Sequence, residues 1–187
     1  MIWKIDLAWI ADQMGLLPCR TFCECAVGPM EISVAPGFIG NCSNMIVVEP
    51  NPTLAAKASA ALNCPILKAA MGFEVADHIL IENNGSSYLE GTWAPTPIHQ
   101  NAKQIKVPVI TFDTIDDGEI DVLALDCEGM EWAVLSKMKS RPRLLTIEVW
   151  DGNPYKDKIY AWLKFNEYHL RFSTGPTTET QLYTCTA

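Results

Sequence analysis

The stretch that decides the fold runs from Ile120 to Trp132 and reads IDVLALDCEGMEW. Its first half is an almost continuous apolar run, which is typical of a strand buried on both faces of a parallel sheet. The run ends at Asp126, and Glu128 and Glu131 follow at short intervals. In open α/β sheets the ligand site lies outside the carboxyl ends of the strands. The three acids therefore stand where a ligand or a reaction is expected.

The composition is that of one globular domain. The chain has 187 residues, of which 49% are hydrophobic and 19% charged, and its net charge is −8. This charge, with no Lys/Arg cluster, disfavours nucleic acid and leaves neutral or cationic small molecules as partners. No segment approaches the ~20 apolar residues of a membrane span, and residues 1–17 lack the pattern of a signal peptide. We expect one domain over residues 1–187, away from membranes, in the cytoplasm, and the oligomeric state stays open.

The seven cysteines show no evident pairing pattern. Cys19, Cys23 and Cys25 have the spacing C-x3-C-x-C, which differs from the usual zinc patterns. We predict that the cysteines are buried reduced thiols and not metal ligands.

Strand-like and helix-like segments alternate along the chain. Strands are predicted at 21–26, 44–49, 65–70, 78–82, 107–113, 120–125, 143–149, 168–172 and 181–185, and helices at 1–17, at 54–62 with Thr53 as its cap, at 130–139 and at 155–165. This alternation predicts an α/β fold with a doubly wound, mostly parallel sheet, and the last two strands predict an antiparallel hairpin. Residues 83–100 are rich in Asn, Gly, Ser, Thr and Pro, which favours a functional lid or a disordered segment.

Two further acids, Glu24 and Glu49, end predicted strands. The small residues Ala26 to Gly28 let a ligand approach the backbone, and Glu49 follows about twenty residues later, the layout by which α/β folds bind a nucleoside through its ribose hydroxyls. The glycine patterns for a dinucleotide or a triphosphate are absent. A phosphate-free nucleoside such as S-adenosylmethionine fits better. We expect Glu49 and Asp126 to emerge side by side from neighbouring strands at one rim.

Several of these segments together resemble the FkbM-type methyltransferases. The resemblance rests on the D-C-E-G-M-E segment that begins at Asp126, on V-V-E-P-N-P at residues 47–52 and on L-L-T-I-E-V at residues 144–149, and it extends from about Thr21 to Tyr168. Two positions depart from the family pattern. Ala26 replaces the first glycine of the family's turn, and Ala124 replaces a lysine two residues before the aspartate.

The resemblance implies a class I methyltransferase (Rossmann-like) sheet that binds S-adenosylmethionine and methylates a hydroxyl of a sugar or a natural product. The cofactor residues it implies fall into three groups: Glu24, Ala26 and Gly28 at the methionine end, Glu49 at the ribose, and Pro50 and Asn51 around the adenosine. It implies further that Asp126 faces the reacting centre.

A hydroxyl acceptor must lose a proton, and the candidate bases are Asp126, Glu128, Glu148 and His99. Of these, His99 is preferably interpreted as a surface residue of the long loop. Glu131 is interpreted as an exposed acid that stabilises a helix through its dipole. Asp126 and Glu128 alone are too few ligands to predict a metal site.

Two other functions remain open. A catalytically inactive protein that keeps the fold and binds the nucleoside is favoured by Ala26 and Ala124. A NAD-dependent oxidoreductase shares the strand-end acid but lacks the glycine pattern.

Overall fold

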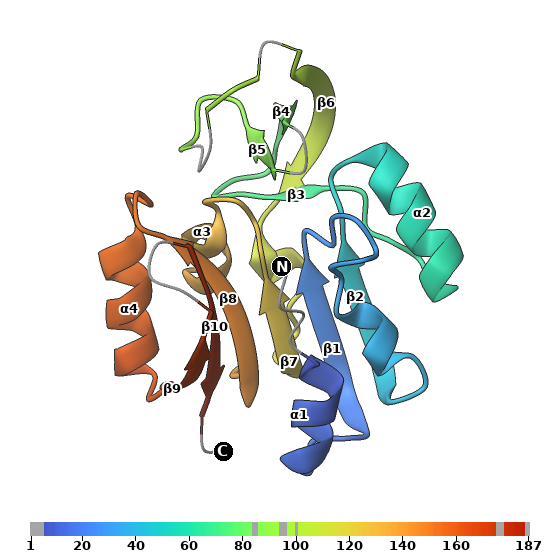
Figure 1. Ribbon diagram of the computed structural model, residues 1–187, viewed down its shortest axis with the longest axis vertical. Helices are drawn as coiled ribbons and strands as arrows, with labels where there is room; N and C mark the ends of the chain where they lie inside the picture. Colours follow the sequence, from blue (N-terminus) through green and yellow to red (C-terminus); the bar gives the residue numbers. More distant parts are fainter. Residues whose placement is uncertain (1–5, 84–85, 94–96, 100, 175–177, 186–187) are drawn as a thin grey trace.

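The computed structural model describes residues 6–83, 86–93, 97–99, 101–174 and 178–185. It is an α/β protein with two sheets (Figure 1). The larger sheet has the order β2-β1-β7-β8-β10-β9 and the smaller has the order β3-β6-β4-β5. The strands of the larger sheet are β1 (Cys19–Cys25), β2 (Cys42–Val48), β7 (Ile120–Leu125), β8 (Leu144–Trp150), β9 (His169–Ser173) and β10 (Thr178–Thr184). Those of the smaller sheet are β3 (Ala70–Met71), β4 (Ala76–Asn83), β5 (Ser86–Leu89) and β6 (Lys103–Ile110).

Both sheets are mixed. In the larger one β2, β1, β7 and β8 run parallel, whereas β10 is antiparallel to β8 and to β9. The expected mostly parallel sheet is therefore confirmed only for these four strands, and the expected antiparallel hairpin is β9 and β10. In the smaller sheet β4 is antiparallel to both of its neighbours.

Helices pack on both faces of the larger sheet because alternate strand residues feed two separate cores. One core joins α1 (Leu7–Gln13), the 3-10 helix η1 (Ala35–Phe38) and α2 (Pro52–Leu62) to the sheet. The other joins α3 (Glu131–Leu135) and α4 (Lys156–Phe165) to it, near the short 3-10 helix η2 (Phe112–Thr114). On β1, Phe22 faces the first core and stacks on Phe38 with ring centroids 4.1 Å apart, while Cys23 faces the second.

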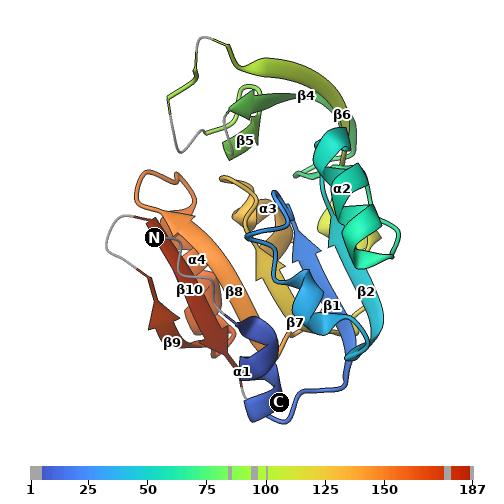
Figure 2. The same cartoon turned by 45° about the vertical axis from the view of Figure 1, so that its right-hand side comes forward.

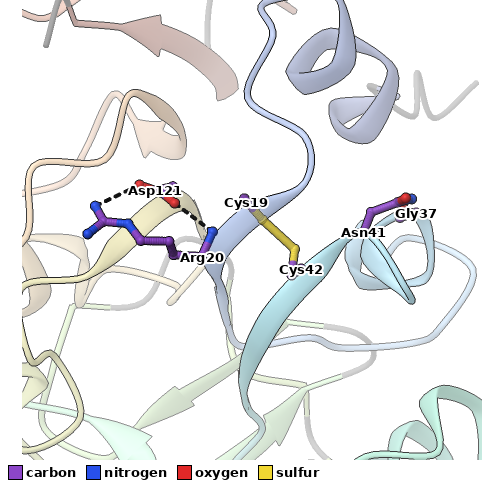
Figure 3. Close-up of a disulfide and its surroundings, with 6 residues drawn as sticks. All are labelled: Cys19, Arg20, Gly37, Asn41, Cys42 and Asp121. Atoms are coloured by element: carbon purple, nitrogen blue, oxygen red, sulfur yellow. Dashed lines mark hydrogen bonds and ion pairs between the residues drawn. A yellow bond between two sulfur atoms is a disulfide. The ribbon is translucent and has the colours of Figure 1, made fainter.

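The amino-terminal ends of the parallel strands are tied together by side chains (Figure 3). A disulfide joins Cys19 on β1 to Cys42 on β2, and Arg20 bonds Asp121 on β7 through its backbone N–H at 2.7 Å and its guanidinium at 3.1 Å. The prediction of reduced thiols is therefore wrong for Cys19 and Cys42. These two residues are direct partners in the β1–β2 register, with Cα atoms 4.6 Å apart. Spacing along the chain does not reveal such a register.

Several element boundaries differ from expectation. The predicted strand at 65–70 is reduced to a bridge from Leu67 to Val48 and to β3, which pairs with β6 in the other sheet. The helix predicted at 130–139 is the single turn α3. The N-terminal helix covers Leu7–Gln13 only, and residues 1–5 of the prediction lie outside the described residues. The cap of α2 is Asn51, not Thr53, because the Asn51 side chain accepts from two backbone N–H groups of the first turn.

The smaller sheet stands beyond the carboxyl ends of the parallel strands (Figure 2). Within the segment predicted as a lid, residues 83–100, Ser86–Leu89 form β5 of this sheet. Part of it, residues 84–85, 94–96 and 100, lies outside the described residues. Among the helices that the structure describes, none has the length and apolar character needed to cross a membrane.

Candidate functional site

The carboxyl ends of the parallel strands bring the predicted site residues to one rim. Val48, Cys25 and Leu125 are aligned across β2, β1 and β7, so Glu49 and Asp126 each stand one residue beyond the same row. The two acids do not leave neighbouring strands, because β1 lies between them. Two strand spacings separate their backbones by about 10 Å. The turn after β1 begins between them, since β1 is the middle strand of the three.

Glu24 is buried, and its carboxylate binds the segment that follows this turn. Its carboxylate accepts from Ser33 Oγ at 2.8 Å and from the backbone N–H groups of Val34 and Ala35 at 3.0 Å each. These bonds hold the start of η1 against β1. The expected contact of Glu24 with the methionine end of a cofactor stays a prediction, and it would be made by a carboxylate already committed to the fold.

The turn after β1 needs left-handed backbone at two positions. Gly28 has φ of 59°, which glycine adopts at no steric cost, and Ala26 has φ of 63°. An L-residue in this region is strained by about 1–2 kcal/mol. Ala26 thus holds a backbone conformation that glycine would adopt without strain.

Glu49 joins the turn after β1 to the turn after β2. Its Oε2 accepts from Gly28 N–H and its Oε1 from Asn51 N–H, both at 2.8 Å. Burial raises the pKa of Glu49, and the two backbone N–H groups oppose this rise. A carboxylate has about four lone-pair positions, so each oxygen keeps one acceptor position beyond these two bonds. The predicted contact of Glu49 with ribose hydroxyls stays a prediction.

The segment after Glu49 starts α2. The Asn51 side chain accepts from Thr53 N–H at 2.9 Å and from Leu54 N–H at 3.4 Å, and Pro52 occupies the first turn, where its missing N–H costs nothing. Asn51 is 1% exposed and Pro50 is half-buried. Both residues stand beside Glu49, and their predicted contact with adenosine remains a prediction.

Three carboxylates converge at the ends of β7 and β8. Asp126, Glu128 and Glu148 each place an oxygen within 4.8 Å of the others. Burial, followed by the charges of Glu148 and Glu128, raises the pKa of Asp126 well above its usual range. Its Oδ1 is shielded from solvent and has no hydrogen-bond partner in the described part of the chain. Glu148 Oε2 accepts from the Trp150 indole N–H at 3.1 Å.

This acid cluster of Asp126, Glu128 and Glu148 can do two things chemically. Carboxylates so close together favour sharing a proton, so the cluster takes up a proton more readily than an isolated carboxylate does. Three carboxylate oxygens are also suitable ligands for a divalent cation. From the sequence only Asp126 and Glu128 could be considered together as cation ligands. Glu148 joins them because Leu125 on β7 is paired with Ile147 on β8, so that Asp126 and Glu148 each follow a paired residue.

The interpretation of Glu131 as an exposed acid is wrong. Its side chain is 0% exposed, and its Oε1 accepts from the backbone N–H groups of Cys127 at 3.0 Å and Gly129 at 3.1 Å. Its Oε2 accepts from Asn153 Nδ2 at 3.2 Å. Glu131 therefore shapes the loop that carries Glu128, whose φ of 48° is left-handed. The helix period alone could not reveal this, because the carboxylate bends back onto its own loop.

Trp93 lies over the same loops. An added Cβ at Gly129 or at Gly152 would come within 3.0 Å of the indole. Gly129 precedes α3 and Gly152 follows β8, so Trp93 packs between the two segments that flank the acid cluster. The sequence suggested a lid here but did not single out either glycine. His99, as expected, is exposed.

The chain matches one family of known proteins. The sequence model of the Methyltransferase FkbM domain matches residues 30–170. No curated protein and no solved structure matches the chain significantly.

Proposed function

Because this chain belongs to the methyltransferase FkbM domain family, we propose that it transfers a methyl group from S-adenosylmethionine to a hydroxyl of a sugar or another small natural product. The class I methyltransferase-like fold of that family accords with the α/β architecture and with helices on both faces of the larger sheet.

The observation that carries this proposal is the rim that Glu49 and Asp126 share. Glu49 fixes both flanking turns and keeps free lone pairs, which supports a ribose site. Asp126 stands about 10 Å away across β1, in a cluster of acids. A nucleoside bound at Glu49 would extend along the turn of Ala26 to Gly28 toward the acid cluster.

Bound S-adenosylmethionine supplies a methyl group already activated by its sulfonium. The protein must then orient the acceptor, which can contribute about 7–11 kcal/mol to lowering the barrier, and must take the hydroxyl proton. The raised pKa of Asp126 suits it to this second task, since its carboxylate accepts a proton more readily than an ordinary aspartate does. Glu128 and Glu148 would share the charge of that proton.

Calorimetric titration with S-adenosylmethionine, S-adenosylhomocysteine and NAD tests the proposal. We expect saturable binding of the first two and weaker binding of NAD. Glu49→Ala should abolish binding, since it removes the acceptor of Gly28 and Asn51 N–H as well as the ribose contact. Asp126→Asn should bind normally and fail to transfer methyl. Stronger binding of NAD than of either adenosyl compound would refute the proposal in favour of an oxidoreductase.

One observation favours a second candidate, an inactive protein that keeps the fold and binds the nucleoside. Ala26 is strained where the family has glycine, so the turn is not optimised for its usual role. This candidate predicts binding of S-adenosylhomocysteine but no methyl transfer to any acceptor, with wild type and Asp126→Asn alike.

The cytoplasmic location remains a prediction. The Cys19–Cys42 disulfide argues against it, because disulfides persist mainly in oxidising compartments. Mass spectrometry of alkylated protein from its native cells would distinguish a cytoplasmic location from an oxidising compartment, because it shows whether Cys19 and Cys42 are reduced or paired. A reduced pair supports the cytoplasm.

A further inference from the structure

A pocket separate from the rim lies between one face of the smaller sheet and the segment that returns from β5 to β6. Its volume is about 330 Å³, within the size range of small-molecule sites. The strands contribute Ile81, Tyr88 and Gln104 to its lining, and the return segment contributes Thr92, Ile98 and His99.

The pocket has a structural origin in the strand register. Ile81 on β4 pairs with Tyr88 on β5 and with Gln104 on β6, so the three side chains share one face of the sheet. The preceding residue on β4, Leu80, belongs to the opposite, buried face. Asn83 at the end of β4 fixes the return segment, since it donates to Pro97 O at 3.1 Å and accepts from His99 N–H at 2.8 Å.

Tyr88 is the unusual member of this lining. The residue is only 4% exposed, yet its hydroxyl has no hydrogen-bond partner within the described ranges. Leaving a buried polar group unpaired costs about 1–3 kcal/mol, and such groups are rare in native proteins. Burial also raises the pKa of Tyr88, so the phenol keeps its proton and can donate. A ligand oxygen in the pocket would satisfy it.

The lining indicates what such a ligand is. Among the residues that the structure describes, the lining contains no Lys or Arg and a single acid, Glu90, so these residues offer an anionic ligand no counter-charge. Hydroxyl, amide and imidazole groups alternate with Ile81 and Ile98. This combination suits a neutral ring that has hydroxyl groups at its edge and apolar C–H groups on its face.

The pocket and the acid cluster are linked by neighbouring residues of one segment. Thr92 lines the pocket, and the next residue is Trp93, whose indole lies against Gly129 and Gly152 in the loops that flank the acids. A molecule held at Tyr88 would therefore lie beside the segment that contacts those loops.

We infer that this pocket is a subsite for a neutral pyranose ring of the acceptor, in which Tyr88 Oη donates a hydrogen bond to a ring or hydroxyl oxygen. The assignment as an acceptor subsite rests on the proposed methyl transfer, whereas the binding of the sugar itself does not.

Saturation-transfer NMR with the methyl α-pyranosides of glucose, mannose and galactose tests the inference. At least one should bind the wild-type protein saturably, and sodium glucuronate should bind more weakly. Tyr88→Phe should weaken that binding about five- to tenfold, the effect of one hydrogen bond. It should leave the melting temperature unchanged or higher, since no partner is lost. Tyr160→Phe, which removes a hydroxyl on α4 that bonds Gln181, is the matched control and should bind normally. His99→Ala, at the exposed edge of the pocket, is a second variant and should weaken glycoside binding.

The inference is overturned if none of the three glycosides binds, or if Tyr88→Phe and His99→Ala bind as the wild type does. Titration of the same samples with S-adenosylhomocysteine separates this from failure of the proposed function. Cofactor binding without glycoside binding refutes the subsite alone, and glycoside binding without cofactor binding refutes the methyltransferase alone.

Discussion

Replacing Glu131 with glutamine should change how the stability of the protein depends on pH. Burial raises the pKa of Glu131 from its ordinary value of 4.5 to about 7. A group whose pKa is higher in the folded state stabilises the fold fully below its unfolded pKa, and that stability is lost as the pH rises through the folded pKa. The rise from 4.5 to about 7 corresponds to about 3 kcal/mol, lost between about pH 4.5 and pH 8.

Glu131→Gln cannot ionise and should lack this loss. Its amide oxygen can still accept from Cys127 and Gly129, but its NH₂ group would face Asn153 Nδ2, a donor. That clash costs about 1–3 kcal/mol. Because this cost does not depend on pH, it lowers the free energy of unfolding equally at every pH.

Urea denaturation followed by circular dichroism at pH 5 and at pH 8 measures the effect. The free energy of unfolding of Glu131→Gln, relative to wild type, should rise by about 2.5 kcal/mol from pH 5 to pH 8. Glu31→Gln, at an exposed glutamate, should parallel the wild type. An equal difference between Glu131→Gln and wild type at both pH values would show that Glu131 is not a buried, protonatable group.

Three other substitutions test the turn, the disulfide and the Trp93 contact. Ala26→Gly should raise the unfolding free energy by about 0.5–1 kcal/mol, since the relief of left-handed strain exceeds the entropy that glycine adds to the unfolded chain. The control Ala56→Gly, on the exposed face of α2, should lower the unfolding free energy by about 1 kcal/mol. If both glycines destabilise, the turn is not strained. Cys42→Ser should lower the unfolding free energy by about 3 kcal/mol, because the disulfide closes a loop across 23 residues, whereas Cys64→Ser at a free cysteine should have little effect. Equal losses of unfolding free energy in the two variants would contradict the Cys19–Cys42 pairing. Gly152→Ala should cost about 1 kcal/mol, and this cost should vanish in a Trp93→Ala background if the indole is what the new methyl meets.

The central part of the fold could be predicted from the sequence because its signals are local. The apolar run Ile120 to Leu125 is β7 to the residue, and Asp126 stands at its carboxyl end. Gly15 follows the C-cap of α1 with φ of 65°, the left-handed conformation with which glycine commonly ends a helix. The smaller sheet was not foreseen, because β5 lies in a polar segment whose pairing with β4 gives no hydrophobic period.

The candidate site was predictable in its acids but not in their partners. Strand-end positions identified Glu49 and Asp126, since a polar residue after an apolar run is visible in the chain. What each carboxylate binds depends on loops brought together only by folding, as with Gly28 and Asn51 at Glu49. Glu131 was misinterpreted for the same reason, because its partner Asn153 belongs to the loop after β8.

A crystal structure of the protein with S-adenosylhomocysteine tests the central claim most directly. The account predicts both ribose hydroxyls within about 2.5–3.0 Å of the Glu49 carboxylate, the nucleoside running along the turn after β1, and the sulfur directed toward Asp126. Adenosine bound anywhere else, or a ribose that makes no contact with Glu49, would contradict it.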